Sequence, residues 1–367
     1  MRTVGEMPVI DARRDAVRGC LLGGAVGDAL GAPVEFDSLH HIRSRFGTGG
    51  VTDFAPAYGR LGAITDDTQM TLFTAEGIVR GRVRWDERGI CHLPSVVHHA
   101  YLRWLFTQDG DWSRSGGGLA HGHDEPDGWL VAQTVLHARR APGNTCLAAL
   151  RAGAIASGRA RNNSKGCGGV MRAAPAGAMA RDRAFEVGCD VAALTHGHPS
   201  GYLPAGVLAA TVAGLLDDMA LEAALADARG QLVVHDGHQE TLAALDAAIV
   251  LGRRGLPAPA DLETLGAGWV GEEALAIGVA CALGAKGFED GVLAAVNHSG
   301  DSDSTGSITG NLLGAIHGVA AIPTRWLDAL EARAIIDQVA CDLHDALAGR
   351  PPTWPSTHGW WDRYPGW

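Results

Sequence analysis

The chain has 367 residues, of which 46% are hydrophobic and 19% are charged. This composition provides enough apolar side chains for a sizeable core and excludes an intrinsically disordered chain. The formal net charge of −11 excludes a predominantly basic, phosphate-binding surface of the kind that nucleic-acid-binding proteins use.

The cysteines and the apolar segments indicate a reduced, cytoplasmic protein. Seven cysteines form no C-x-x-C pair, which argues against a disulfide framework and against a cysteine-based zinc site. Residues 16–33 place an Arg before an apolar run, but Asp28 interrupts that run and acidic residues precede it, so we expect no signal peptide there. No uninterrupted apolar stretch reaches the ~18 residues of a membrane span, so we expect none.

The apolar pattern predicts helices. In chain order, Ala- and Leu-rich segments that suit helices cover residues 9–31, 66–81, 129–140, 144–158, 183–194, 204–228, 239–254, 271–284 and 306–319. The alternation of Val, Ile and Thr that indicates strands is almost absent. We therefore predict an all-α fold. Because no shift in composition marks a boundary, we also predict a single domain over residues 1–367.

Three irregular segments interrupt the predicted helices, at 43–65, 107–128 and 350–367. The first two are long enough to be functional loops. Segment 107–128 could act as a lid in which Trp112 or His121 stacks on a ligand. The third segment is a Pro/Trp-rich tail, and we expect its Trp side chains to cover an exposed edge of the core.

Two of the predicted helices carry a glycine at every fourth position. These residues are Gly23, Gly27 and Gly31 in one helix and Gly310, Gly314 and Gly318 in the other. A glycine inside a helix costs about 1 kcal/mol relative to alanine. Three of them on one face are explained if the helix backbones approach each other closely, and we predict such contacts at the centre of the protein.

Two short segments concentrate carboxylates and hydroxyls directly before apolar helices. They are Ile64-Thr65-Asp66-Asp67-Thr68 and Gly300-Asp301-Ser302-Asp303-Ser304-Thr305-Gly306. One such residue suffices to cap a helix, and a second carboxylate causes repulsion unless a cation neutralises it. Oxygen ligands of this kind select Mg²⁺, Ca²⁺ or Mn²⁺ rather than zinc, and four carboxylates suit a two-metal centre.

The pattern Asp301-x-Asp303-x-Thr305 also matches two unrelated motifs. One is the nucleophile motif of haloacid-dehalogenase-type phosphatases, which follows a buried hydrophobic strand, whereas polar residues precede Asp301. The other is the start of an EF-hand loop, which needs a Glu where this chain has Leu312. Both readings fail on their context.

In order and spacing, the motifs from about residue 16 to residue 320 resemble the ADP-ribosylglycohydrolase family. The resemblance is carried by Gly23-x-x-x-Gly27-Asp28-Ala29-Leu30-Gly31-x-x-x-Glu35, Thr65-Asp66-Asp67-Thr68, Asn163-Ser164-Lys165-Gly166-x-Gly168-x-x-Met171-Arg172-x-x-Pro175, Thr195-His196 and Gly300-Asp301-Ser302-Asp303-Ser304. It implies an all-α, orthogonally packed multi-helix bundle with a dinuclear Mg²⁺ or Mn²⁺ centre in a central cleft. It also implies hydrolysis of the glycosidic bond between ADP-ribose and a protein side chain or another acceptor, which releases ADP-ribose.

Carried over by position, the resemblance implies roles for individual residues. The implied metal ligands are Thr65, Asp66, Asp67, Asp301, Asp303 and Ser304. Asp66 or Asp303 would bridge the two ions, and Glu35 would be the acid or base, so the expected catalytic residues are Glu35, Asp66 and Asp303. The implied substrate-binding residues are Gly166, Cys167, Gly168, Gly169, Met171 and His196, although many family members have Asn in place of Cys167.

The residues alone leave other interpretations open. The glycine-rich segment 162–172 could be a plain turn, His196 a structural hydrogen-bond partner and Glu35 an exposed surface residue. At the level of function, the chain could be an ADP-ribose-binding or structural protein, since the resemblance extends to lens crystallins, or a hydrolase of another ribosyl compound. The intact acidic segments favour the enzyme. Nucleic acid is then expected as a partner only if it carries ADP-ribose.

Overall fold

The computed structural model describes residues 11–113, 125–153 and 158–366. In these residues the β pairings are limited to two isolated bridges, so the predicted all-α fold is confirmed. The longer helices are α1 (Ala12–Gly31), α2 (Leu39–Phe46), α3 (Asp66–Arg88), α4 (Leu93–Asp109), α6 (Asn144–Arg151), α7 (Arg181–Ala193), α8 (Pro199–Leu216), α9 (Leu221–Leu232), α10 (Gln239–Gly252), α12 (Gly271–Gly284), α13 (Phe288–Val296), α14 (Ser302–His317) and α16 (Arg333–Leu347). Shorter helices are α11 (Pro259–Leu262) and α15 (Thr324–Ala329).

Two of the predicted helices are wrong. Residues 129–140 contain turns and one 3₁₀ turn, because the segment is held by tertiary contacts; the carbonyl of Arg140, for example, accepts from the N–H of Asp66 at 3.2 Å. Residues 204–228 form parts of two helices, α8 and α9, because Asp218 between them has a φ of 61°. Asp tolerates this left-handed conformation better than most residues, and a residue in this conformation interrupts a right-handed helix.

Other predictions need smaller corrections. The predicted helix 144–158 ends at Arg151, and residues 154–157 lie outside the described residues. The predicted loop 43–65 begins inside the short helix α2. Helices α4, α13 and α16 were not predicted, because their apolar residues are mixed with His, Asp, Arg and Gln and lack a long Ala/Leu-rich run.

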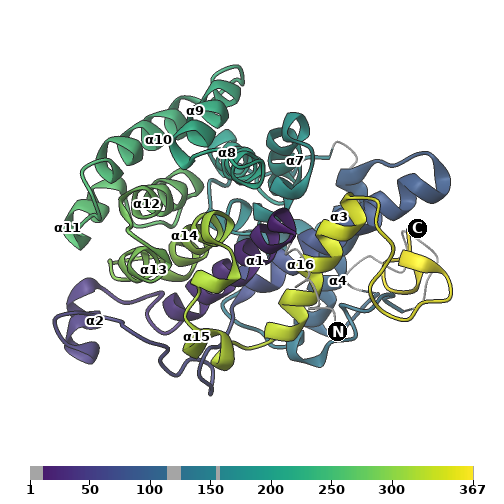
Figure 1. Ribbon diagram of the computed structural model, residues 1–367, viewed down its shortest axis with the longest axis horizontal. Coiled ribbons are helices and arrows are strands. Elements are labelled where there is room, and N and C mark those ends of the chain that lie inside the picture. Colours follow the sequence, from purple (N-terminus) through teal and green to yellow (C-terminus); the bar gives the residue numbers. More distant parts are fainter. Residues whose placement is uncertain (1–10, 114–124, 154–157, 367) are drawn as a thin grey trace, which may run out of the picture.

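Helices α1 and α14 pack against each other at the centre of the molecule (Figure 1). A Cβ atom on Gly27 would lie 2.0 Å from the carbonyl oxygen of Gly306, and one on Gly310 would lie 2.0 Å from that of Gly23. The predicted close contact between the glycine faces is therefore confirmed. Gly31, the last residue of α1, meets the backbone of Ser302, the first residue of α14. The two helices therefore run antiparallel, and the end of α1 lies beside the start of α14.

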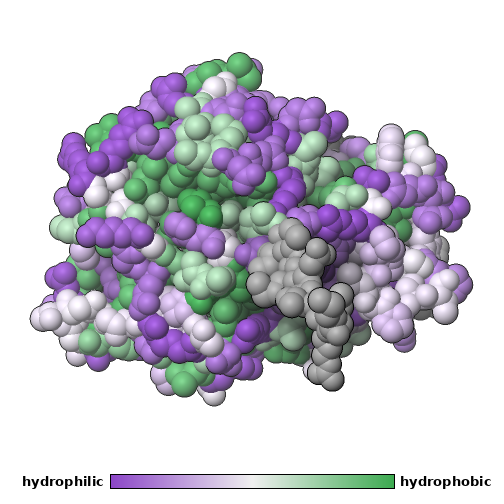
Figure 2. All heavy atoms as spheres, in the orientation of Figure 1, coloured by the Kyte–Doolittle hydropathy of each residue, from purple (hydrophilic) through white to green (hydrophobic). Residues whose placement is uncertain are grey.

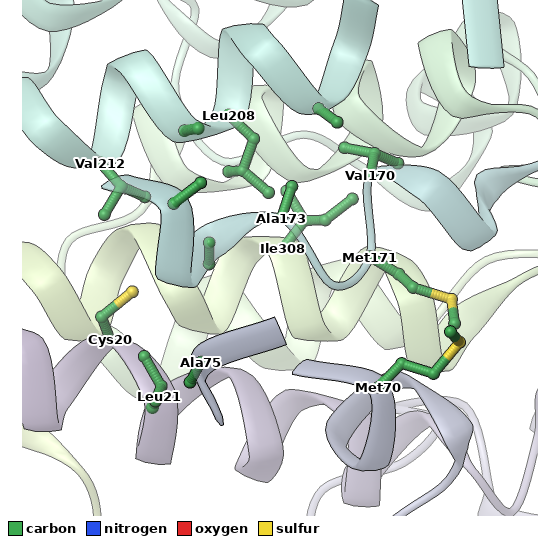
Figure 3. Close-up of a cluster of buried hydrophobic side chains, with 14 of the residues drawn as sticks. Cys20, Leu21, Met70, Ala75, Val170, Met171, Ala173, Leu208, Val212 and Ile308 are labelled. Carbon is green, nitrogen blue, oxygen red and sulfur yellow. The ribbon is translucent and has the colours of Figure 1, made fainter. Parts of the chain in front are cut away.

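A core of apolar side chains surrounds this helix pair. Figure 3 shows Leu208 of α8 facing Ile308 of α14, while the side chains of Met70 and Met171 point toward each other. Of the described helices, only α8 is long and apolar enough to cross a membrane, and 94% of that window is buried inside the protein. Its composition is therefore explained by its position in the core.

The Pro/Trp-rich tail lies against α3, α16 and the segment before α6. Tyr364 is fully buried, and its hydroxyl donates to a carboxylate oxygen of Asp342 at 2.7 Å. The guanidinium of Arg363 stacks over the rings of Trp354 and Trp129 at 3.9 and 4.5 Å. The partly buried rings of Trp354, Trp360 and Trp361 pack against the core, so the tail covers an edge of it, as predicted. On the face shown in Figure 2, apolar residues lie between hydrophilic ones.

Candidate metal centre and active site

Acidic side chains from three parts of the chain gather at one end of the α1–α14 pair. They come from the turn after α1, the first turn of α3 and the start of α14. We call the set Glu35, Asp66, Asp67, Asp301 and Asp303 the acidic cluster. None of these five residues is more than 7% exposed, so the cluster is buried.

Glu35, Asp301 and Asp303 are the most tightly grouped members of the acidic cluster. Each offers a carboxylate oxygen that lies within 4.8 Å of the oxygens of the other two. Within the described residues, no other three His, Cys, Asp or Glu side chains meet this criterion. The close contact between α1 and α14 explains this geometry, because it brings the end of one helix to the start of the other.

The start of α3 completes the arrangement. The side chain of Thr65 accepts from the N–H of Asp67 at 3.2 Å and is also a hydrogen-bond partner of the Asp303 carboxylate. Ser304, which is 1% exposed, donates its N–H to Asp303 at 2.9 Å. All six residues expected to bind metal therefore lie in one region together with Glu35.

The carboxylates of the acidic cluster perturb one another strongly. Burial raises the pKa of Asp66, Asp67 and Asp301 well above its ordinary value, and the charge of Asp303 raises each of them further. The same two causes raise the pKa of Glu35 to about 10. At neutral pH, ionising the whole cluster is thus unfavourable unless positive charge is placed among the carboxylates.

Three members of the acidic cluster also have a buried oxygen without a hydrogen-bond partner in the described structure. These atoms are Oε2 of Glu35, Oδ1 of Asp67 and Oδ2 of Asp301. Leaving a buried acceptor unpaired costs about 1–3 kcal/mol. Free carboxylate oxygens are the ligands that Mg²⁺ and Mn²⁺ prefer. The donor set therefore fits divalent cations.

Asp28 has a different role from its acidic neighbours. Its carboxylate accepts from the N–H groups of Thr65 at 3.0 Å and Thr68 at 3.1 Å, and from the Thr68 hydroxyl. Burial followed by the charge of Asp303 raises its pKa to about 7, while the threonine hydrogen bonds oppose this shift. Asp28 thus ties α1 to the start of α3 and orients the Thr65–Thr68 segment.

Sequence reasoning missed a second support for this segment. The guanidinium of Arg140 donates to both carboxylate oxygens of Glu331, at 2.6 and 2.9 Å, and to the carbonyl of Ile64 at 2.9 Å. Glu331 in turn accepts from the N–H of Ile64 at 3.1 Å. Both residues are buried. They are separated by 191 positions, and neither belongs to a motif, so no local signal could have paired them.

The glycine-rich segment is tightly packed. A Cβ atom on Gly168 would lie 2.9 Å from the sulfur of Cys146 and 3.1 Å from Cε1 of His196. One on Gly169 would lie 2.4 Å from the carbonyl oxygen of Gly201. Packing within the protein is therefore sufficient to explain both glycines, and the contact of this segment with a diphosphate stays a prediction.

Two residues next to these glycines border the acidic cluster. Asp301 and Ser304 both act on the pKa of the Cys167 thiol. Burial and the charge of Asp301 raise that pKa well above its ordinary value. Met171 is 3% exposed, and its sulfur lies 4.0 Å from the Ser304 hydroxyl. The segment therefore forms part of the wall around α14.

His196 lies behind the glycine-rich segment. Its side chain is 1% exposed, and Nδ1 lies 2.8 Å from the hydroxyl of Thr195. Burial and the charge of Arg172 lower the pKa of His196 to about 3, so its ring is neutral at physiological pH. His196 is thus a buried, hydrogen-bonded residue that supports Gly166 and Gly168, whose Cβ positions it approaches.

Exposed aromatic rings stand beside the acidic cluster. Phe36 directly follows Glu35, is 72% exposed and stacks on Trp269 with 5.6 Å between the ring centroids and 15° between the planes. Trp112, by contrast, is buried, with its ring 6.1 Å from that of Phe106, and it is not available for stacking on a ligand. His121, the other residue suggested for that role, lies outside the described residues.

Comparisons with known proteins agree on one family. A family model described as ADP-ribosylglycohydrolase matches residues 10–353. The chain is 28% identical to an uncharacterized protein of Archaeoglobus fulgidus, over 89% of the chain and 95% of that relative. It is 26% identical to the ADP-ribosyl-[dinitrogen reductase] glycohydrolase of Rhodospirillum rubrum, over 91% and 97%. It is 23% identical to the ADP-ribosylarginine hydrolase Tri1 of Pseudomonas putida, over 90% and 78%.

A solved structure shares the fold. It is described as an ADP-ribosylglycohydrolase-related protein complex and matches with a TM-score of 0.62 and 26% sequence identity. The match covers 92% of this chain and 100% of the other. The range matched by the family model, residues 10–353, includes both helix starts that carry the acidic residues and the glycine-rich segment between them.

Proposed function

The chain belongs to the ADP-ribosylglycohydrolase family, and from this premise we propose that it is a hydrolase that releases ADP-ribose from an acceptor with the help of two Mg²⁺ or Mn²⁺ ions. The observation that carries the proposal is the grouping of Glu35, Asp301 and Asp303, with carboxylate oxygens within 4.8 Å of one another. The unpaired buried oxygens of Glu35, Asp67 and Asp301 support it, because a purely structural cluster would satisfy them.

The expected ligands are Thr65, Asp66, Asp67, Asp301, Asp303 and Ser304. When bound, the cations would polarise the hydroxyls of the distal ribose and help to activate water. The ligand residues would fix the orientation of that sugar, so that its anomeric carbon faces Glu35. Holding the reacting groups in this way converts a bimolecular encounter into a positioned reaction.

Glu35 is suited to move the proton. In the proposed reaction, a water oxygen bonds to the anomeric carbon, the bond from that carbon to the acceptor breaks, and the Glu35 carboxylate takes a proton from the water. Glu35 then returns the proton to the leaving acceptor atom. Since the transition state resembles an oxocarbenium ion, the carboxylates of the acidic cluster would also stabilise its positive charge.

The acceptor is proposed from the relatives. Two of them are named for an ADP-ribosylated dinitrogen reductase and for ADP-ribosylarginine. We therefore propose an ADP-ribosylated protein as the substrate, with arginine as the first linkage to test. The exposed rings of Phe36 and Trp269 are the groups beside Glu35 that such an acceptor would meet first.

The test measures release of ADP-ribose from arginine-, serine- and nucleobase-linked substrates, each with Mg²⁺, with Mn²⁺ or with excess EDTA. We expect turnover only with metal. Asp303→Asn should lower kcat by at least about 100-fold, because it removes a charge central to the cluster. As a matched control, Asp328→Asn changes a carboxylate whose side chain is 66% exposed, and should leave the rate unchanged.

Two outcomes would contradict the proposal. Full activity in excess EDTA would exclude the metal-dependent mechanism. Tight binding of ADP-ribose without turnover of any linkage would instead favour a binding protein on the same scaffold.

A further inference from the structure

Three exposed aromatic rings stand beside the acidic cluster. In the described structure, four aromatic side chains are among the exposed large apolar ones: Phe36, Tyr58, Trp85 and Trp269. Trp85 lies near the far end of α3, away from the cluster. Phe36 directly follows Glu35, and Trp269 stacks on its ring. Phe36 is nevertheless 72% exposed, so most of its side chain is open to a ligand.

Tyr58 is held in a conformation that few tyrosines adopt. It lies in a tight turn in which Ala57 and Arg60 exchange two backbone hydrogen bonds, of 3.0 and 3.1 Å. Both central residues have a positive φ, 50° at Tyr58 and 82° at Gly59, as in a type I′ turn. Asn, Asp and Gly suit such positions, whereas a bulky side chain there is strained. Strain of this kind is typical of functional sites, so the ring at this position calls for a function.

Contacts with Arg140 place the Tyr58 ring at the edge of the acidic cluster. The guanidinium of Arg140 lies 5.3 Å from the centre of this ring. The same guanidinium donates to the carbonyl of Ile64 at 2.9 Å, and the carbonyl of Arg140 accepts from the N–H of Asp66 at 3.2 Å. Tyr58 is 45% exposed, so part of its ring stays open to solvent. Burial, followed by the charge of Glu35, raises the pKa of the Tyr58 hydroxyl, which agrees with this placement.

The open rings of Phe36 and Tyr58 suit a planar cation. Aromatic faces attract cations, and the Tyr58 ring already carries the guanidinium of Arg140. The carboxylates of the acidic cluster add a negative potential. We propose that Phe36 and Tyr58 form an acceptor subsite, which binds the guanidinium of an ADP-ribosylated arginine and thereby determines the preferred acceptor. Trp269 is a positioning residue, because it supports the ring of Phe36. The inference rests on the proposed function, since it concerns the acceptor of the same reaction.

Other groups fit the acceptor subsite less well. A serine side chain is small and neutral, so the two rings would contribute little to its binding. A nucleobase can stack on aromatic rings, but it carries no positive charge that the carboxylates would attract. The adenine of ADP-ribose is such a base. The experiment therefore compares the arginine-linked substrate with free ADP-ribose, which contains the adenine and lacks the acceptor.

Kinetics of the full-length protein with ADP-ribosylated arginine in Mg²⁺ give the first readout. Phe36→Ala and Tyr58→Asn should each raise KM about 3- to 30-fold, the range of a cation–π contact, and leave kcat within about threefold. Asn suits the turn, so this variant removes the ring and keeps the backbone, while Tyr58→Phe keeps the ring and should match the wild type. Trp85→Ala is the matched control, because Trp85 is 57% exposed and remote, and KM should not change.

Binding of ADP-ribose gives a second readout that needs no turnover. Measured by calorimetry in Mg²⁺, the Kd for ADP-ribose should agree within about twofold between the wild type, Phe36→Ala and Tyr58→Asn, because ADP-ribose lacks the group that the subsite binds. Circular dichroism melts check that the variants fold, and Phe36→Leu, which is apolar without an aromatic face, serves if Phe36→Ala does not fold.

The outcomes separate the acceptor subsite from the proposed function. If both variants leave KM unchanged, or weaken ADP-ribose by the factor by which they raise KM, the rings do not bind the acceptor, and the inference is overturned while the hydrolase stands. Turnover of serine- or nucleobase-linked ADP-ribose without turnover of the arginine-linked substrate would have the same consequence. If the wild type hydrolyses none of these linkages, both the inference and the proposed function are overturned.

Discussion

The buried guanidinium of Arg172 organises the residues behind the glycine-rich segment. It donates to the hydroxyls of Tyr101 at 3.0 Å and Thr195 at 2.6 Å, and to the carbonyl of Val191 at 3.1 Å. The third nitrogen, Nη1, donates to the carbonyl of Gly168. The positive charge is thus held close to the imidazole of His196, and together with burial it keeps that ring neutral.

His196 should therefore make the protein sensitive to acid. Its pKa is 6.5 in the unfolded chain and about 3 in the folded protein, so the unfolded state binds more protons between these values. The stability that His196 contributes is full above about pH 6.5 and falls as the pH drops toward 3. Urea titrations at pH 7 and pH 5 measure this loss as a decrease in the free energy of unfolding. In His196→Gln the decrease should be smaller than in the wild type by on the order of 2 kcal/mol.

The contrary result for His196 is easily recognised. If wild type and His196→Gln lose stability in parallel over this pH range, the ring is not held neutral by the fold. Because Gln retains hydrogen-bonding capacity, a uniform offset between the two curves reports packing alone, and only the difference in slope reports protonation.

At the scale of elements, the contact between α1 and α14 allows a sharp test with one type of substitution. Gly310→Ala places a methyl group 2.0 Å from the carbonyl oxygen of Gly23, which the backbone can accommodate only by moving the helices apart. We expect a loss of about 3 kcal/mol in the free energy of unfolding, measured by chemical denaturation. Because the contact aligns the start of α14 with the end of α1, metal affinity should fall as well.

Gly230→Ala is the control for the glycine contact. Gly230 lies in α9, and a Cβ atom there would meet nothing within 4 Å. The same substitution should therefore stabilise the protein by up to about 1 kcal/mol through helix propensity. Opposite signs for the two variants are expected; equal effects would mean that the glycine faces do not hold the helices together.

The Arg140–Glu331 pair supports the start of α3 and can be tested independently of the metal. Glu331→Gln leaves the Arg140 charge buried without its carboxylate, so we expect a loss of about 3 kcal/mol in the free energy of unfolding. Arg60→Ala removes an exposed partner of the same carboxylate, 2.9 Å away, and should cost less than about 1 kcal/mol. A similar small cost for both variants would show that the buried pair does not stabilise the segment.

Some of these elements could be predicted from sequence because their signals are local. The glycines of α1 and α14 recur every fourth residue, and the paired aspartates stand directly at helix starts. The pair of Arg140 and Glu331 could not be predicted, since its members meet only after folding. Long-range contacts also hold residues 129–140 outside a helix, although their composition suits one: the N–H of Trp129 donates to the carbonyl of Arg363 at 3.3 Å, and the carbonyl of Arg140 accepts from the N–H of Asp66 at 3.2 Å.

At the scale of the whole molecule, the acidic cluster joins the front and the rear of the chain. Residues near position 35 and residues near position 301 meet there, and the fold must bring their like charges together. The sequence indicated which carboxylates are candidates for binding metal. That Glu35 groups closely with Asp301 and Asp303, rather than with Asp66 and Asp67, depends on the helix packing. Only three-dimensional structure can supply such distances.

This arrangement predicts how metal and pH together control stability. Since burial and like charge raise the pKa values of Asp66, Asp67 and Asp301, the folded, metal-free protein binds protons that the unfolded chain releases above about pH 4. Without metal, these groups therefore favour folding at low pH and lose this contribution as the pH rises. A divalent cation that binds only the folded protein raises the free energy of unfolding by about 2.7 kcal/mol when its concentration is 100 times its Kd. With the cation bound, stability should therefore no longer fall as the pH rises.

Thermal melts in EDTA, in Mg²⁺ and in Na⁺ at equal ionic strength measure this coupling. In EDTA near neutral pH, Asp303→Asn should have a higher melting temperature than the wild type, because the substitution removes a buried charge that repels the other carboxylates of the acidic cluster. In Mg²⁺ the order should reverse, because the variant has lost a metal ligand. If Mg²⁺ shifts both proteins equally, the stabilising ion binds somewhere other than the acidic cluster, and if Na⁺ reproduces the shift, the effect is screening alone.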